Sequence, residues 1–222
     1  MIGLSLGHGI KHFGQGALLV MSPSIKGSLK ISEIALGAIF TTQSIASVLT
    51  NIPAGIMADM YRRHISRLLA VSMLLVGLGY MAIGFSEWYS LTLVAVLAVG
   101  AGTSLWHAPA FGTLASLYPS QKGLAMSAHL TGAQIGNTLS PIIIGFLLGG
   151  TLLNFHFEGV PWNFLSMSLA IPMGLTALIV LLRFKQNTNQ NQNNLRIQQY
   201  LNLSKRLVRN KVILAMILLG AM

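Results

Sequence analysis

Long runs of apolar residues separated by short polar segments dominate the chain. A helix that spans a membrane needs about 20 mainly apolar residues. Runs of that kind occupy residues 2–21, 34–58, 68–85, 91–115, 124–153 and 162–182. None alternates between apolar and polar residues with a period of two, and an open sheet leaves its backbone unsatisfied in lipid, so strands are excluded. The pattern predicts an all-α polytopic membrane bundle with six transmembrane helices.

The chain ends inside a seventh apolar run. This run begins at Val212 and holds 11 residues, whereas a span needs at least about 17. We interpret 212–222 as the start of a truncated seventh transmembrane helix, after a six-helix domain over 1–184. Residues 185–211 between them are predicted to be a cytoplasmic central linker, because their polar tract cannot bury a core. Apolar and basic residues at its end fit either an interfacial helix or an ordinary basic loop.

Composition agrees with a membrane protein and excludes several other classes. Of the 222 residues, 53% are hydrophobic and 8% are charged, whereas a soluble domain has about a quarter charged residues. Nucleic-acid binding is therefore a poor explanation for the net charge of +10. Zero cysteines exclude disulfides and thiolate metal sites, and 4 acidic residues leave few carboxylate pairs for enzymatic chemistry. We expect no enzyme and no cofactor.

The positions of lysine and arginine predict the orientation, because positively charged loops are retained on the cytoplasmic side. Most of them follow the second, fourth and sixth runs: Arg62, Arg63, Arg67, Lys122, Arg183, Lys185, Arg196, Lys205, Arg206, Arg209 and Lys211. Lys26 and Lys30 lie on the opposite side. We expect a plasma (inner) membrane protein with a cytoplasmic N-terminus.

Polar residues recur with a period of three helices. The first and fourth predicted helices carry ionisable groups, the second and fifth carry small residues and amides, and the third and sixth carry few of either. An inverted repeat of three plus three helices would leave this pattern. It predicts first members that line a cavity and third members that face lipid.

The first predicted helix has one polar face. His8, Lys11, His12 and Gln15 fall within about 100° of one another at 3.6 residues per turn. An ammonium at mid-membrane costs at least about 2.5 kcal/mol, so this face is expected to line a substrate cavity. The alternative is that Lys11 snorkels or pairs structurally. His8 and His12 also have the spacing of a metal-binding pair. Because Lys11 would repel a cation, we expect no metal site.

The fourth and fifth predicted helices add further polar residues. Trp106 and His107 precede Pro109, which removes a backbone hydrogen bond and favours a kinked, polar, aromatic site. The fifth helix contains His129, Gln134 and Asn137. We assign these residues to the same cavity. For His129, a hydrogen-bonded structural histidine and a proton-coupling group are equally compatible with the sequence.

Small residues on the fifth predicted helix indicate close helix packing. Gly132, Gly136 and Ser140 follow one another at intervals of four, and Pro141 comes next. Small residues at that spacing let two helices approach closely in a membrane.

The loop after the second helix carries a family resemblance. It reads Gly55-Ile-Met-Ala-Asp59-Met-Tyr-Arg62-Arg63-His64. This resembles the glycine, aspartate and basic signature of the major facilitator superfamily, in the cytoplasmic loop where that family has it. Two further stretches, 106–109 and 123–132, are similar to its fosmidomycin-resistance-like branch. The sequence departs from the usual pattern at Arg62, where the family has glycine, and at Val96, where it often has arginine.

The resemblance implies an N-terminal half of a twelve-helix transporter. Its first and fourth helices would line the central cavity, and a missing C-terminal half or a second copy would complete it. Gly55, Asp59, Arg62 and Arg63 would form a gating loop, with Asp59 against a helix start of the second half and Arg63 in the same charge relay. The alternative is a plain surface salt bridge of Asp59 with Arg62 or Arg63.

The predicted function is secondary active transport of a small molecule by alternating access, as efflux, including drug resistance, or as uptake. The cationic wall indicates an anionic or amphiphilic substrate, and a coupling proton is compatible with the histidines. The alternative is a non-transporting scaffold or sensor derived from a half-transporter. A membrane-embedded hydrolase is a distant third, because Gly3-Leu-Ser5-Leu-Gly7 matches a nucleophile elbow but has no preceding strand.

Overall fold

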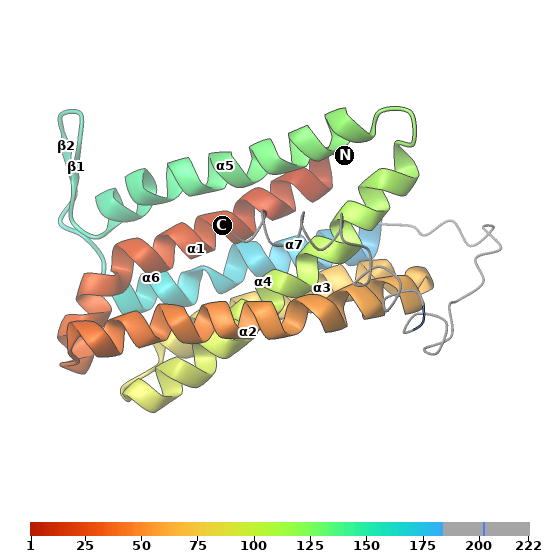
Figure 1. The fold of residues 1–222 in the computed structure, drawn as a ribbon. Coiled ribbons are helices and arrows are strands. Elements are labelled where there is room, and N and C mark those ends of the chain that lie inside the picture. Colours follow the sequence, from red (N-terminus) through yellow and green to blue (C-terminus); the bar gives the residue numbers. More distant parts are fainter. Residues whose placement is uncertain (184–201, 203–222) are drawn as a thin grey trace.

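A computed structural model describes residues 1–183 and Asn202. The predicted linker over 185–211 and the predicted seventh helix over 212–222 therefore lie outside the described residues, apart from Asn202. The described chain is a bundle of long helices whose directions alternate along the sequence (Figure 1). The N-terminus, the α2–α3 and α4–α5 connections and the end of α7 lie at one end of the bundle, so the basic connections share that end.

The elements follow one another in the order of the apolar runs. They are α1 Ile2–Leu29, α2 Glu33–Met60, the 3₁₀ turn η1 Arg62–His64, α3 Ile65–Gly84, α4 Tyr89–Leu117, α5 Lys122–Leu147, β1 Thr151–Leu152, β2 Phe155–His156, α6 Trp162–Ser168 and α7 Ala170–Arg183. By length and composition, 5 candidate spans are apolar enough to cross a membrane, with α6 and α7 counted as one. The 28-residue α1 is not among them, because its polar residues lower its apolar content.

The start of α2 shows how the sequence sets a helix boundary. Lys30 closes α1 with a left-handed backbone, φ 52° and ψ 41°. Ser32 then caps α2, and its side chain accepts a hydrogen bond from the backbone N–H of Ala35 at 3.2 Å. Glu33 occupies the first turn, where a negative charge interacts favourably with the helix dipole. These signals set the boundary between α1 and α2.

The predicted helix over 124–153 is wrong at its C-terminal end. The structure ends α5 at Leu147, and Gly149 then adopts φ +112°, a conformation that interrupts a helix. A short antiparallel hairpin follows, with Thr151 opposite His156 and Leu152 opposite Phe155. The exclusion of strands is therefore wrong for this connection. The hairpin projects from the end of the bundle (Figure 1), where its backbone N–H and C=O groups do not all have to be paired as they would within lipid.

Helix contacts support the three-helix repeat. The first triplet consists of α1, α2 and α3, and the second begins with α4 and α5. The first helix of each triplet contacts the second helix of the other, because α1 packs mainly on α5 and α4 packs on α2. The expectation that third helices face lipid is too simple, because α3 is the most buried candidate span and packs against α4, α6 and α7. Its outer face still exposes apolar side chains, namely Val71, Leu74, Leu78 and Met81.

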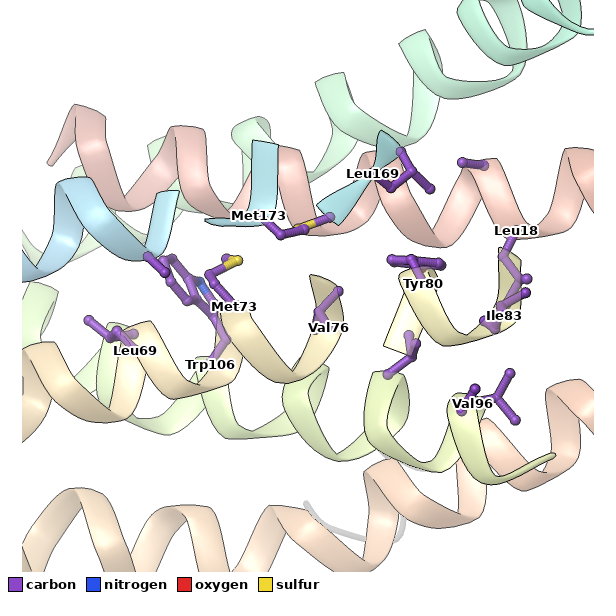
Figure 2. Close-up of a cluster of buried hydrophobic side chains, with 14 of the residues drawn as sticks. Leu18, Leu69, Met73, Val76, Tyr80, Ile83, Val96, Trp106, Leu169 and Met173 are labelled. Carbon is purple, nitrogen blue, oxygen red and sulfur yellow. The ribbon is translucent and has the colours of Figure 1, made fainter. Parts of the chain in front are cut away.

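A continuous apolar core joins α1, α3, α4 and α7. Figure 2 shows Trp106 near Met73 and Leu69, with Tyr80 and Met173 further along the same core. All five side chains are fully buried. Packing of this kind fixes the rotation of α4 about its axis and therefore decides which of its other side chains point toward α1 and α5.

The interface between α1 and α5 is made by the predicted small residues. A Cβ atom on Gly132 would collide with the carbonyl oxygen of Ser5, and one on Gly136 would collide with that of Gly9. The hydroxyl of Ser140 donates a hydrogen bond to the carbonyl of Phe13 at 2.7 Å. The backbones of the two helices are therefore in direct contact, as small residues permit in a membrane. Pro141 is exposed on α5.

We expect Gly136→Ala to lower the thermal stability of the full-length protein. The added methyl group overlaps backbone atoms, which cannot move aside as a flexible side chain would, and overpacking of this kind costs about 1–3 kcal/mol. Gly145→Ala on the same helix is the matched control, since nothing lies within 4 Å of its added Cβ. Thermal unfolding in detergent checks the prediction, and equal melting temperatures for the two variants would contradict it.

Candidate functional site

Five polar side chains from three helices meet in one place. We call them the histidine cluster: His8, Lys11 and His12 from α1, His107 from α4 and His129 from α5. His8, Lys11 and His129 are at most 1% exposed, while His12 and His107 are partly buried. The structure thus brings together all five ionisable residues that the sequence assigned to the cavity. Their positions on α1, α4 and α5 follow from the core packing of α4 and the close contact of α1 with α5.

Lys11 lies inside the bundle without an acidic partner. Its ammonium donates to His107 Nε2 at 2.9 Å and approaches the carbonyl oxygen of Thr103 at 3.5 Å. Within the described residues, the ion pairs join Lys26 to Glu33 and Arg62 to Asp59, far from this position in the sequence. The acidic residues of the chain, Glu33, Asp59, Glu87 and Glu158, stand near helix ends or between helices. A buried ammonium held only by neutral groups retains most of its desolvation cost, which a bound anion would relieve.

The two α1 histidines have their ring orientation fixed by hydrogen bonds. His8 Nδ1 lies 3.0 Å from the carbonyl oxygen of His129, and His12 Nδ1 lies 3.3 Å from Asn137 Oδ1. Their Nε2 atoms face each other at 3.2 Å. The His8 ring also stacks on the His129 ring, with centroids 4.0 Å apart and an interplanar angle of 14°.

His129 is fully buried but poorly satisfied. Neither ring nitrogen makes a hydrogen bond of good geometry within the described residues, although the backbone of Leu4 is close to the ring. The Phe111 ring packs against it edge-on at 5.2 Å. The described structure therefore does not show His129 as a fully hydrogen-bonded structural histidine, which was one of the two interpretations that the sequence left open.

The remaining residues assigned to the cavity are more scattered. Trp106 is fully buried in the apolar core, with its ring against Gly7 of α1, and does not join the cluster. Gln15 is partly buried further along α1, and Gln134 is exposed on α5. Asn137 is exposed as well and reaches the cluster through its contact with His12.

Two residues near the cluster were missed by the sequence interpretation. Thr103 offers its carbonyl oxygen to Lys11, and Phe111 stacks on His107 with centroids 6.2 Å apart. Together with His107 they occupy positions 103, 107 and 111 of α4. An interval of four residues puts side chains on the same helix face, so this spacing is the signal that could have identified Phe111. Thr103 contributes a backbone carbonyl oxygen, which side-chain spacing does not reveal.

The predicted gating loop lies at the end of α2. Arg62 Nη2 is 3.2 Å from Asp59 Oδ1, and these side chains are 45% and 42% exposed. Such an exposed pair stabilises a fold by about 0–1 kcal/mol. Gly55 is partly buried within α2, and Arg63 is exposed and makes no ion pair within the described residues. Within the described residues, Asp59 thus makes only the surface salt bridge.

Comparison with known proteins identifies a matching family and a curated relative. The sequence profile of the Major Facilitator Superfamily matches residues 4–222. The fosmidomycin resistance protein of Escherichia coli (strain K12) is 25% identical over 168 residues, which is 76% of this chain and 40% of that protein. The chain therefore spans less than half the length of this curated relative.

Solved transporter structures have the same fold. A bacterial homologue of the human lysosomal transporter Spinster, in an inward-facing and unoccupied conformation, aligns with a TM-score of 0.67 at 18% identity, over 88% of this chain and 43% of that one. A peptide transporter POT in complex with sulfate aligns with a TM-score of 0.70 at 18% identity, over 98% of this chain and 45% of that one. At this identity the likeness shows the fold alone.

Proposed function

This chain belongs to the Major Facilitator Superfamily, and on that basis we propose that it forms the N-terminal half of a secondary active transporter that moves a small anionic or amphiphilic molecule. The observation that supports the proposal best is the fully buried ammonium of Lys11, which is surrounded by histidines and has no acidic partner among the residues that the structure describes. An anion in contact with Lys11 supplies the missing negative charge.

A second six-helix half, or a second copy of this half, completes the proposed transporter. The relatives are more than twice the aligned length. Among the candidate spans α2 and α5 are the least buried. A shallow apolar groove runs along α2, lined by Phe40, Thr41, Ser44, Ile45, Val48 and Leu49. Another helical half packed on α2 and α5 would cover this surface and enclose the histidine cluster.

Alternating access in this proposal uses the end of α2 as a latch. Asp59 contacts a helix start of the second half in one conformation and exchanges that contact for Arg62 in the other. The proposal assigns the N-terminus and the basic loops to the cytoplasm, and the charge distribution supports this orientation. The cluster histidines are the groups that would carry a coupling proton in this proposal, because they are ionisable side chains in contact with one another inside the bundle.

The structure gives no support to the hydrolase alternative. Ser5 lies in the first turns of α1, and its hydroxyl approaches the carbonyl oxygen of Met1 at 3.3 Å. A nucleophile elbow requires a strand and a sharp turn before the helix. Within residues 1–183, the two short strands lie in the distant 151–156 hairpin.

Flux measurements on the full-length protein test the proposed function. We expect proteoliposomes that contain the protein to accumulate or release one member of a panel of small organic anions. The panel includes fosmidomycin, the compound that appears in the name of the E. coli relative. Matched liposomes without protein give the background. Flux that responds to an imposed pH gradient would support proton coupling, whereas neutral or cationic compounds as the transported molecules would contradict the anion assignment.

A further inference from the structure

We propose that His8, His12 and His107 form a binding site for a divalent transition-metal ion such as Zn²⁺. One nitrogen from each ring lies within 4.8 Å of the other two, across α1 and α4. This inference is independent of the transported molecule. It revises the expectation, drawn from the spacing of His8 and His12 alone, that no metal binds here.

Hydrogen bonds determine which nitrogens are free to bind an ion. A carbonyl oxygen can only accept, so His8 Nδ1 carries the proton that it shares with the carbonyl of His129. His12 Nδ1 likewise donates to Asn137 Oδ1. The Nε2 atom of each ring is then unprotonated. This is the arrangement of metal-binding histidines, in which the second ring nitrogen donates to a backbone or side-chain oxygen.

The unprotonated nitrogens face one another. His8 Nε2 and His12 Nε2 are 3.2 Å apart, and two lone pairs at that distance repel unless a proton or a metal ion lies between them. Zinc binds histidine nitrogen at about 2.0–2.1 Å, and two ligands of a tetrahedral ion are then about 3.3 Å apart. The observed separation matches that value, so the two rings need almost no movement to hold the ion.

His107 supplies the third ligand in competition with Lys11. The ammonium of Lys11 has no lone pair and can only donate, so His107 Nε2 is the acceptor at 2.9 Å. A metal ion would take the place of this ammonium at the nitrogen. Three neutral histidines leave a fourth position of the tetrahedron for water or an anion. Lys11 and the ion are therefore mutually exclusive partners of His107.

Cobalt spectroscopy on the full-length protein, purified without a histidine tag, tests this site. We expect Co²⁺ to give the strong visible absorption of a tetrahedral complex and Zn²⁺ to displace it. The signal should disappear in His12→Gln and His107→Gln. His129→Gln, within the same cluster, and the exposed His64→Gln and His156→Gln should retain it, since none of these rings offers a nitrogen to the site.

A change at Lys11 gives an opposite and more specific signal. Lys11→Met removes the competing charge, and we expect it to tighten Co²⁺ binding by about tenfold or more. Absence of the tetrahedral spectrum in the wild-type protein would overturn the proposal, as would binding that persists in the His12→Gln, His107→Gln double variant. Since Lys11→Met is expected to abolish anion transport, failure of the metal site and failure of the transport proposal give distinguishable results.

Discussion

Replacing Lys11 with methionine is expected to abolish transport of an anionic substrate by the full-length protein. The ammonium of Lys11 is fully buried and has no carboxylate partner within the described residues, so in the proposed mechanism the substrate supplies its counter-charge. Removing one partner of a buried charge pair costs about 2 kcal/mol or more, which corresponds to a loss of about 30-fold or more in affinity. Substrate binding and flux in proteoliposomes measure the effect.

Folding should survive this substitution. Methionine has a similar length and is apolar, and replacement of a buried charge by an apolar side chain is often neutral or stabilising. Lys26→Met is the matched control on the same helix, because Lys26 pairs with Glu33 near a helix end. It should leave flux unchanged. Retained transport with unaltered substrate affinity in Lys11→Met would remove this residue from the substrate site.

Replacing Asp59 with asparagine is expected to reduce flux at least about tenfold while leaving stability unchanged. The exposed pair with Arg62 contributes about 0–1 kcal/mol to the fold, so a structural role predicts almost no effect of this nearly isosteric change. A latch depends on the charge of Asp59 at a helix start of the second half, and asparagine lacks that charge. Initial flux rates and the melting temperature, measured on the same preparation, separate these outcomes.

Glu33→Gln provides the control for Asp59. Glu33 stands at the opposite end of the same helix and also forms an exposed pair with a basic residue. If both variants lose flux equally, the effect of Asp59 arises from general charge loss rather than from gating. Full activity of Asp59→Asn would contradict the latch, because it would mean that the end of α2 has no part in the conformational change.

Much of the fold could be predicted because each apolar run is long and most are bounded by polar or turn residues. The end of α5 could not, since apolar side chains continue on both sides of Gly149 and only the glycine pair interrupts them. Two small residues hardly change the average apolarity of a span, but glycine allows the backbone a positive φ that ends the helix. The hairpin that follows depends on pairing between Leu152 and Phe155, which no single-helix pattern reveals.

The candidate site was predictable in its residue types and only partly in its membership. The polar face of α1 follows from helix periodicity. Trp106 and His107 were assigned to the same cavity, but neighbouring residues on a helix point about 100° apart, and in the structure the two side chains meet different surroundings. The core takes Trp106 and thereby turns His107 toward Lys11. The pairing of specific atoms depends on the rotation and register of three helices, which the sequence of one helix does not contain.

The crossed packing of the two triplets has a consequence for how the protein is synthesised. Lys11 meets Thr103 only after 92 further residues have been made, and His8 meets His129 only after 121. A nascent chain that has so far produced α1, α2 and α3 holds its most polar helix without these partners. The first three helices therefore cannot complete their tertiary contacts before α4 and α5 have been synthesised.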